Sequence, residues 1–328
     1  MKIRIIAALF VFLSGSLLVS KELIIPNNIQ IKENSAIESV LCNLADSEIY
    51  QPIDLQVIDD FMIIGNAKPS EIVKLDLNGN VLIRKAKEGR GPGEFIFCLS
   101  PRKFGENILF VDINNKILFY DLHLNFIKEV KLALYTRDFV ITKNNNLIFP
   151  ERYGSEFYLS RYSIDGKLLK KIGVKEEKYN PKDEFSSYNR PRLLAYDKSR
   201  DIIWCDNLGK YELRSFKDDN KKDLIKPEKE LFNKYKTIDK DTGEKVMELD
   251  GRSIRLISIN DRLFNFFHKK EIAYVDVFEI NKFVHIKKIR FKNKYVLISI
   301  INQNEFYGIS YDEEGDPLLY KIEISGFK

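Results

Sequence analysis

Residues 105–121 read GENILFVDINNKILFYD, and this stretch decides how the chain folds. The polar turn Gly105-Glu106-Asn107 leads into an apolar strand that ends at Asp112, and a second apolar strand follows another polar turn. Val, Ile, Leu, Phe and Tyr dominate both strands, which is typical of strands that are covered on both faces. The stretch therefore predicts two neighbouring strands of one antiparallel sheet.

The same pattern recurs through most of the chain. Each copy has a polar turn between two short apolar strands, and a third apolar strand follows. The six turns are Asp59-Asp60, Gly105-Glu106-Asn107, Asn144-Asn145-Asn146, Ser199-Arg200-Asp201, Asn260-Asp261 and Asn302-Gln303-Asn304. Their mean spacing of about 49 residues lies in the range of four-stranded propeller blades. We therefore expect an all-β, six-bladed β-propeller rather than a two-sheet β-sandwich.

The last copy lacks a fourth strand. Five copies continue into one, with Asn78-Gly79 and Asp165-Gly166 as hairpin signals, but the chain ends soon after the third strand of the sixth copy, Leu318–Ile324. A propeller must close its ring, because an open blade would expose an unpaired strand edge. Upstream, Ile29-Gln30-Ile31-Lys32 alternates apolar and polar residues. We expect this N-terminal segment to close the last blade by pairing with Leu318–Ile324.

The first twenty residues have the pattern of a secretory signal peptide. Lys2 and Arg4 precede the apolar run Ile5–Leu13, and small residues follow it. The run is too short for a membrane-spanning helix, which needs about 20 apolar residues. Cleavage after Ser16 and cleavage after Ser20 both fit. We expect residues 1–20 to be a signal peptide and residues 21–328 to form a single domain.

This leader indicates export to the periplasm, the cell surface or the medium. No Cys lies near the end of the apolar run, so the acylated Cys of a bacterial lipoprotein is missing. A buried N-terminal helix is the alternative, but Lys21 and Glu22 end the run without an amphipathic face. We expect no transmembrane span in the mature chain.

The composition excludes several classes of protein. The 53 Lys and Arg against 48 Asp and Glu leave a net charge of only +5, which gives no reason to expect a nucleic-acid partner. Three Cys are an odd number for an exported chain, and Cys98 and Cys205 have apolar neighbours. We therefore interpret the cysteines as small buried residues and expect no disulfide framework. In the charged insertion Lys217–Gly251, Pro227–Tyr235 is the best candidate for a helix.

Two stretches carry a family resemblance. Gly89-Arg90-Gly91-Pro92-Gly93-Glu94-Phe95 resembles the GxGPGEF-type signature of the exported six-bladed β-propeller proteins common in Bacteroidetes. Residues 111–121, VDINNKILFYD, are similar to the strand-Asp-x-x-Asn-strand core of NHL repeats, which form related propellers. The resemblance implies a fold and an exported location but no catalytic residues. Many family members resemble lipoproteins, so the missing Cys implies soluble export here.

The glycine-rich signature is better interpreted as a turn than as a phosphate loop. It lacks the Lys-Ser/Thr of a P-loop, and its glycines do not have dinucleotide-binding spacing. Gly91-Pro92-Gly93-Glu94 fits a type II turn with Gly93 at the position of positive φ. We expect a structural motif made of Gly89, Gly91, Pro92, Gly93, Glu94 and Phe95.

Propeller geometry places the candidate ligand residues on one face. The links between blades and the turns between second and third strands share a surface. The candidates there are Arg102, Arg137, Arg192, Arg252, Asp112, Glu151, Asp206 and Asn207. The arginines could ring the channel and bind an anionic ligand, such as a uronate-bearing or sulfated glycan or an acidic peptide. Salt bridges between these arginines and the carboxylates, or turn capping, are the alternative.

The sequence gives little support for catalysis. His123, His268 and His285 fall on different strands and turns, so we expect no catalytic triad, metal or cofactor. The leading hypothesis is a monomeric, exported, non-enzymatic propeller that binds an unknown protein or glycan at one channel face. The alternative is a calcium-type hydrolase or lactonase of the same fold, in which Asp112, Glu151, Asp206 and Asn207 would cage the metal.

Overall fold

The structure is a computed structural model. It describes residues 21–26, 31–32, 36–86, 88–133, 137–151, 155–175, 191–207, 210–227, 234–238, 245–249, 251–270 and 272–325. The predicted signal peptide, residues 1–20, lies outside these ranges. Within them, no helix has the length and apolar character needed to cross a membrane.

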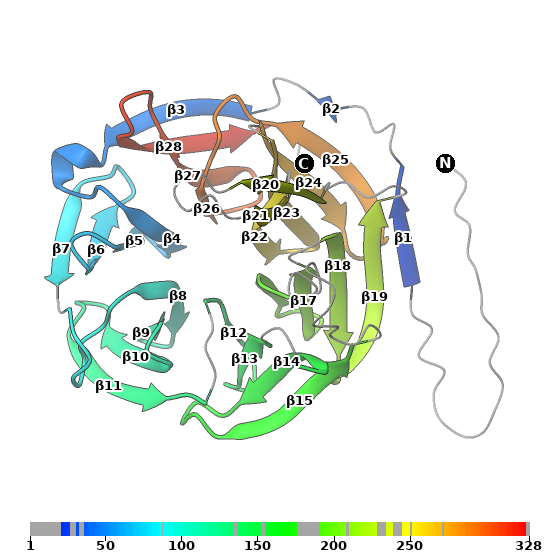
Figure 1. Cartoon of the computed structure of the whole chain (residues 1–328), viewed down its shortest axis with the longest axis horizontal. Helices are drawn as coiled ribbons and strands as arrows, with labels where there is room; N and C mark the ends of the chain where they lie inside the picture. The colour runs from blue at the N-terminus through cyan, green and yellow to red at the C-terminus, as the bar shows by residue number, and fades with distance from the viewer. Residues whose placement is uncertain are drawn as a thin grey trace.

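Six sheets, each built on four antiparallel strands, stand in a ring around a central axis, so the predicted six-bladed β-propeller is confirmed (Figure 1). Blade 1 contains β4 (Pro52–Ile58), β5 (Phe61–Asn66), β6 (Glu71–Asp76) and β7 (Val81–Ala86). Blades 2 and 3 contain β8 (Cys98–Phe104), β9 (Asn107–Asp112), β10 (Lys116–Asp121), β11 (Phe126–Lys131), β12 (Val140–Ile141), β13 (Leu147–Pro150), β14 (Phe157–Tyr162) and β15 (Leu168–Val174). In each blade the first strand lies innermost, and the chain then runs outward.

The other three blades follow the same plan. Blades 4 and 5 contain β16 (Leu194–Asp197), β17 (Ile202–Asn207), β18 (Lys210–Lys217), β19 (Asn220–Pro227), β22 (Gly251–Ile259), β23 (Arg262–Lys269), β24 (Ile272–Glu279) and β25 (Val284–Arg290). Blade 6 contains β26 (Leu297–Ile300), β27 (Glu305–Tyr311), β28 (Pro317–Ile324) and, from the N-terminal part of the chain, β3 (Ala36–Asn43). Each of the six repeats seen in the sequence is therefore one blade.

An N-terminal strand closes the ring, as predicted, but the predicted segment is wrong. The strand that pairs antiparallel with β28 is β3, whereas β2 (Ile31–Lys32) pairs parallel with β25 of blade 5. The Glu38 carboxylate of β3 accepts hydrogen bonds from the backbone N–H of Lys292 (2.8 Å) and from the Tyr295 hydroxyl (2.6 Å). These bonds to the link between blades 5 and 6 hold β3, and not the earlier segment, on the last blade.

The N-terminal segment lies along the outer edges of three blades. Before β2 and β3, β1 (Lys21–Ile25) adds a parallel fifth strand to blade 4 beside β19. Figure 1 shows β1, β2 and β3 in succession around the rim. Blades 4 and 5 thus have five strands each.

The charged insertion does not contain the predicted helix where the structure describes it. Pro227 ends β19, and Lys234 and Tyr235 begin β20 (Lys234–Ile238). This strand forms an antiparallel hairpin with β21 (Lys245–Leu249). Residues 228–233 lie outside the described ranges.

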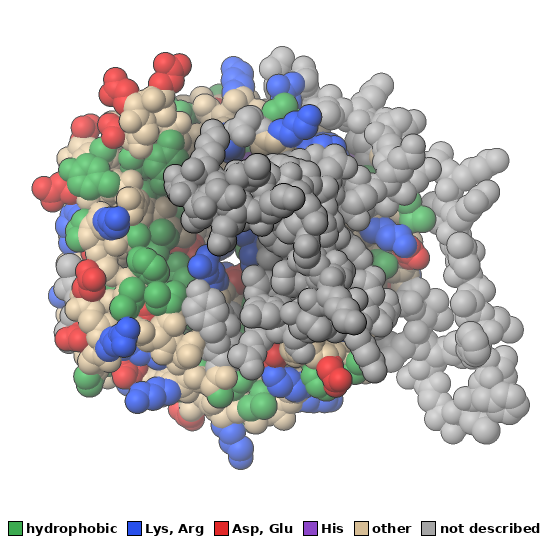
Figure 2. Space-filling view, viewed as in Figure 1, with side chains coloured by type: hydrophobic (Ala, Val, Ile, Leu, Met, Phe, Trp, Pro, Cys, Tyr) green, Lys and Arg blue, Asp and Glu red, His purple; other side chains and the backbone are tan. Residues whose placement is uncertain are grey.

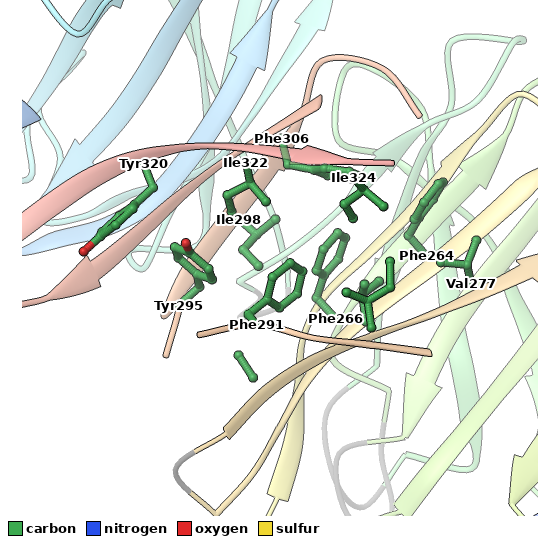
Figure 3. Packing of buried hydrophobic residues seen from close by; sticks show 13 residues of the cluster. Phe264, Phe266, Val277, Phe291, Tyr295, Ile298, Phe306, Tyr320, Ile322 and Ile324 are labelled. Atoms are coloured by element: carbon green, nitrogen blue, oxygen red, sulfur yellow. The ribbon is translucent and has the colours of Figure 1, made fainter. Parts of the chain in front are cut away.

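The hydrophobic core is divided into clusters between neighbouring blades. Figure 3 shows the cluster between blades 5 and 6, where Phe264 and Phe266 of β23 pack against Phe291 and Phe306. Cys98 and Cys205 are buried in such clusters, as predicted, and Cys42 is half-buried; all three are free thiols. Each pair of neighbouring blades shares one such cluster.

Candidate functional site

Polar side chains near the axis connect consecutive blades. The innermost strand of a blade has no further strand on its inner side, so its backbone N–H groups need other acceptors. Side-chain oxygens of the preceding blade supply them. The acceptor and N–H pairs are Asp54 Oδ2 with Ser100 (2.7 Å), Asp138 Oδ2 with Leu194 (2.8 Å) and Ser299 Oγ with Val57 (2.8 Å). These bonds connect blade 1 to 2, blade 3 to 4 and blade 6 to 1.

Arg102 belongs to this connecting network. Its guanidinium pairs with Asp138 at 2.6 Å, and it donates to Gln56 Oε1 at 3.2 Å and to the Phe139 carbonyl at 3.1 Å. Burial lowers the pKa of Arg102, while the Asp138 charge opposes the shift. The contacts of this predicted ligand residue therefore tie blades 1, 2 and 3 together.

Arg255 of β22 also reaches this network, and the sequence analysis missed it. Its guanidinium lies 3.7 Å from Asp54 Oδ1 and donates to Gln56 Oε1 at 2.5 Å. A β-bulge between Ser253 and Arg255 shifts the register of β22. The Arg-Ser-Ile-Arg stretch at 252–255 was the available signal, but a bulge cannot be recognised from strand alternation.

Arg192, Arg137 and Arg252 form a second, more open group, which we call the mouth. Arg192 is half-buried just before β16, and its guanidinium donates to the Ser253 carbonyl of blade 5. Arg137 and Arg252 are exposed at the start of the innermost strands of blades 3 and 5. In Figure 2, Lys or Arg side chains lie on one side of the centre of the ring.

Charges of both signs act on the Arg192 guanidinium. Burial lowers the pKa of Arg192; the charges of Asp206 and Asp138 oppose this shift, and the charges of Arg252 and Arg137 add to it. Its Nε is buried and has no hydrogen-bond acceptor among the described residues. The Arg252 and Arg137 guanidinium groups therefore lie close enough to Arg192 to repel it, while Asp206 and Asp138 attract it.

Asp112 and Asp206 have the same structural role in two blades. Asp112 is the last residue of the second strand of its blade and Asp206 the last but one, and each accepts two consecutive backbone N–H groups at the entry to the innermost strand. The donors are Ile96 and Phe97 (both 3.0 Å) for Asp112, and Arg192 (2.8 Å) and Leu193 (2.7 Å) for Asp206. Burial raises the pKa of Asp206, although Arg192 opposes the shift. These contacts are turn caps, the alternative left open by the sequence.

The other two candidate oxygens lie in separate surroundings. Glu151 follows β13 and forms an ion pair with Lys171 of β15, within blade 3. Asn207 is buried at the end of β17 in blade 4. Within the described ranges, no three His, Cys, Asp or Glu side chains gather closely enough to hold a metal ion.

The glycine-rich loop is fastened to blade 2. The Glu94 N–H donates to the Gly91 carbonyl at 3.0 Å, and Gly93 has the predicted positive φ, +69°. Lys116 donates to the Gly91 carbonyl (3.1 Å), and the Tyr120 hydroxyl donates to the Gly93 carbonyl (3.1 Å). Phe95 is fully buried. The loop therefore has the contacts of a structural turn.

Solved structures share this fold at low sequence identity. A protein of Bacteroides fragilis NCTC 9343 that is described as exported superposes with a TM-score of 0.60 at 12% identity, over 94% of this chain and 99% of that one. A DUF4221 family member from Bacteroides vulgatus ATCC 8482 gives 0.58 at 12% identity, over 88% and 97%. Streptogramin B lyase gives 0.55 at 11% identity, over 88% and 98%. At these identities the likeness concerns the fold alone.

No curated protein matches the chain. The family comparison is informative, because residues 45–311 match a family whose description agrees with the six blades seen here. The chain thus belongs to DUF5128, a family described as a 6-bladed beta-propeller.

Proposed function

We propose that this chain is an exported, non-enzymatic, monomeric propeller that binds an anionic ligand at the mouth formed by Arg137, Arg192 and Arg252. The ligand class is a uronate-bearing or sulfated glycan, or an acidic segment of another protein. The observation that carries the proposal is that the buried Nε of Arg192 lacks an acceptor among the described residues, while the guanidinium groups of Arg252 and Arg137 lie close enough to act on its charge.

An anion at this place would relieve two unfavourable features at once. It would supply an acceptor for a buried donor, which is costly to leave unsatisfied. It would also offset part of the repulsion that Arg252 and Arg137 exert on Arg192. The planar guanidinium can bind a carboxylate or a sulfate through two parallel hydrogen bonds. Several fixed positive groups close together would also raise the local concentration of anions.

Export supports the choice of ligand class. The N-terminal pattern of residues 1–20 is that of a secretory leader, and the structurally similar B. fragilis protein is described as exported. A protein in the periplasm or at the cell surface meets acidic glycans and other exported proteins. The lack of an acylatable Cys near the leader's apolar run agrees with soluble export.

The alternative is a calcium-type hydrolase or lactonase, and it needs Asp112, Glu151, Asp206 and Asn207 around one metal. These residues belong to blades 2, 3 and 4, and three of them hold identified partners within their own blades. Metal analysis of the purified protein separates the two functions. Stoichiometric Ca²⁺ retained after dialysis would favour the hydrolase.

The binding proposal is tested with a panel of acidic and neutral oligosaccharides and acidic peptides. We expect saturable binding of acidic members only. We also expect affinity to fall when salt rises from about 0.01 M to about 0.1 M, which shortens the Debye length from ~30 Å to ~10 Å. Equal binding of neutral and acidic glycans would refute the proposal.

A further inference from the structure

Asp223 of β19 is a buried carboxylate without a cationic partner among the described side chains. The residue is 5% exposed. Its Oδ2 accepts a hydrogen bond from the Ser215 hydroxyl at 3.2 Å, and its own N–H donates to the same hydroxyl oxygen at 2.9 Å. Buried carboxylates in proteins are normally paired with a positive charge, because an isolated buried charge is strongly unfavourable. A positively charged group beside the Asp223 carboxylate would therefore complete this arrangement.

The backbone nitrogen of Lys21 lies against this carboxylate. It donates to Asp223 Oδ1 at 3.3 Å, and Lys21 is the register partner of Asp223 in the parallel pair of β1 and β19. All five residues of β1 pair with β19, Ile25 is buried in the core cluster of blades 4 and 5, and Glu22 pairs with Lys226 at 2.5 Å. The position of the Lys21 nitrogen thus follows from the pairing of β1 with β19.

We infer that export processing hydrolyses the Ser20–Lys21 peptide bond, and that the α-ammonium created at Lys21 is the counter-ion of Asp223. In this step a signal peptidase adds water across the bond. Ser20 leaves with the oxygen as a carboxylate, and the Lys21 nitrogen takes protons to become –NH₃⁺. An α-amino group has an ordinary pKa of about 8 and is mostly charged at neutral pH. The inference rests on the proposed export.

Cleavage at the alternative position would not complete this pair. A chain that begins after Ser16 keeps Lys21 as an uncharged amide. Its ammonium group would lie four residues away, which in extended chain is about 13 Å. The 3.3 Å distance is long for a hydrogen bond from a backbone N–H to a carboxylate. Hydrogen bonds between an ammonium group and a carboxylate are shorter, about 2.7–2.9 Å. The structure therefore selects between two cleavage sites that the sequence leaves open.

The first test is the N-terminus of the full-length chain after secretion by a bacterial host. Intact mass and N-terminal sequencing are expected to give Lys21 as the first residue. A mature chain that begins at Leu17 would overturn the inference but leave export standing. A chain that stays uncleaved in the cytoplasm would contradict export itself.

The second test measures the ion pair directly and does not depend on export. Chains that begin at Lys21 and at Leu17 are released from a fusion partner without extra residues, and their melting temperatures are compared. We expect the Lys21 chain to melt higher by roughly 2–5 °C. The difference should vanish in Asp223→Asn, which keeps the side chain's shape, and persist in Asp218→Asn, a change at an exposed neighbour. Equal melting of the two chains, or a difference that survives Asp223→Asn, would overturn the inference.

Discussion

Replacing Gly93 tests the structural role of the glycine-rich loop. The residue has φ +69°, and a Cβ at this position would lie 2.7–2.9 Å from ring atoms of Phe126 in β11. The ring cannot withdraw freely, because it packs against Tyr120 with 5.8 Å between centroids. Gly93→Ala therefore introduces two separate costs, an unfavourable backbone conformation and a steric clash.

Gly105 provides a matched control within the same blade. Its φ is +58°, and nothing lies within 4 Å of a Cβ built there. Gly105→Ala should cost only the backbone strain, about 1–2 kcal/mol. Gly93→Ala should add overpacking of about 1–3 kcal/mol, for a total of roughly 2–5 kcal/mol.

The assay is urea unfolding of both variants, with Gly93→Ala repeated in a Phe126→Ala background. We expect Gly93→Ala to destabilise the protein more than Gly105→Ala does. Removing the ring should bring the two substitutions to a similar cost, which the double-mutant cycle isolates. If Gly93→Ala and Gly105→Ala cost the same in the original background, the contact with Phe126 carries no energy and the reasoning fails.

Three further predictions concern closure, thiols and acid stability. A chain that begins at residue 36 should remain soluble, whereas one that begins at residue 44 loses β3, exposes the edge of β28 and should aggregate; equal solubility of the two would contradict closure by β3. Cys98 and Cys205 should resist alkylation in the native state, since both are buried and burial raises the pKa of each thiol, and peptide mapping should find Cys42 labelled first. Burial raises the pKa of Glu129, but Lys116 and the Gly93 N–H outweigh it, so the folded-state pKa lies below the unfolded one. The ion pair of Glu129 with Lys116 stabilises the fold at pH values above the unfolded-state pKa, and this stability is lost as the pH falls through the folded-state pKa. Glu129→Gln should therefore flatten the acid side of the profile of melting temperature against pH. An unchanged slope would contradict this prediction.

The fold could be predicted because it repeats. Each blade has its own turn and strand pattern, so a strand that is assigned wrongly in one copy can be corrected by comparison with the other copies. The closing strand occurs only once in the sequence pattern, so no other copy supports its assignment. Ile29–Lys32 has clean alternation, yet Ala36–Asn43 occupies the position because Glu38 bonds to a link more than 250 residues away. Long-range contacts of this kind leave no local trace in the sequence.

The site was predictable in residue type but not in role. The sequence places both Arg102 and Arg192 at the start of an innermost strand, but Arg102 lies inside β8 and forms an ion pair with Asp138, whereas Arg192 precedes β16 and does not. An arginine at this position joins the connecting network only where a carboxylate of the next blade lies within ion-pair distance. Arg255 was overlooked because a bulge, which the sequence does not announce, shifts the register of its strand. The local sequence pattern predicts on which face of a strand a side chain lies, but it does not predict which residue that side chain contacts.

The most direct test of the account is the affinity of Arg252→Ala for an acidic oligosaccharide, compared with that of Arg262→Ala. Both changes remove one guanidinium from β22 or β23 of blade 5, at opposite ends of the hairpin, and Arg262 donates to Gln303 at 2.8 Å away from the mouth. A charge-assisted hydrogen bond contributes about 1.5–3 kcal/mol, so Arg252→Ala should weaken binding about tenfold or more. Arg262→Ala should bind as the unaltered protein does. Equal affinity of the two variants would contradict anion binding at the mouth.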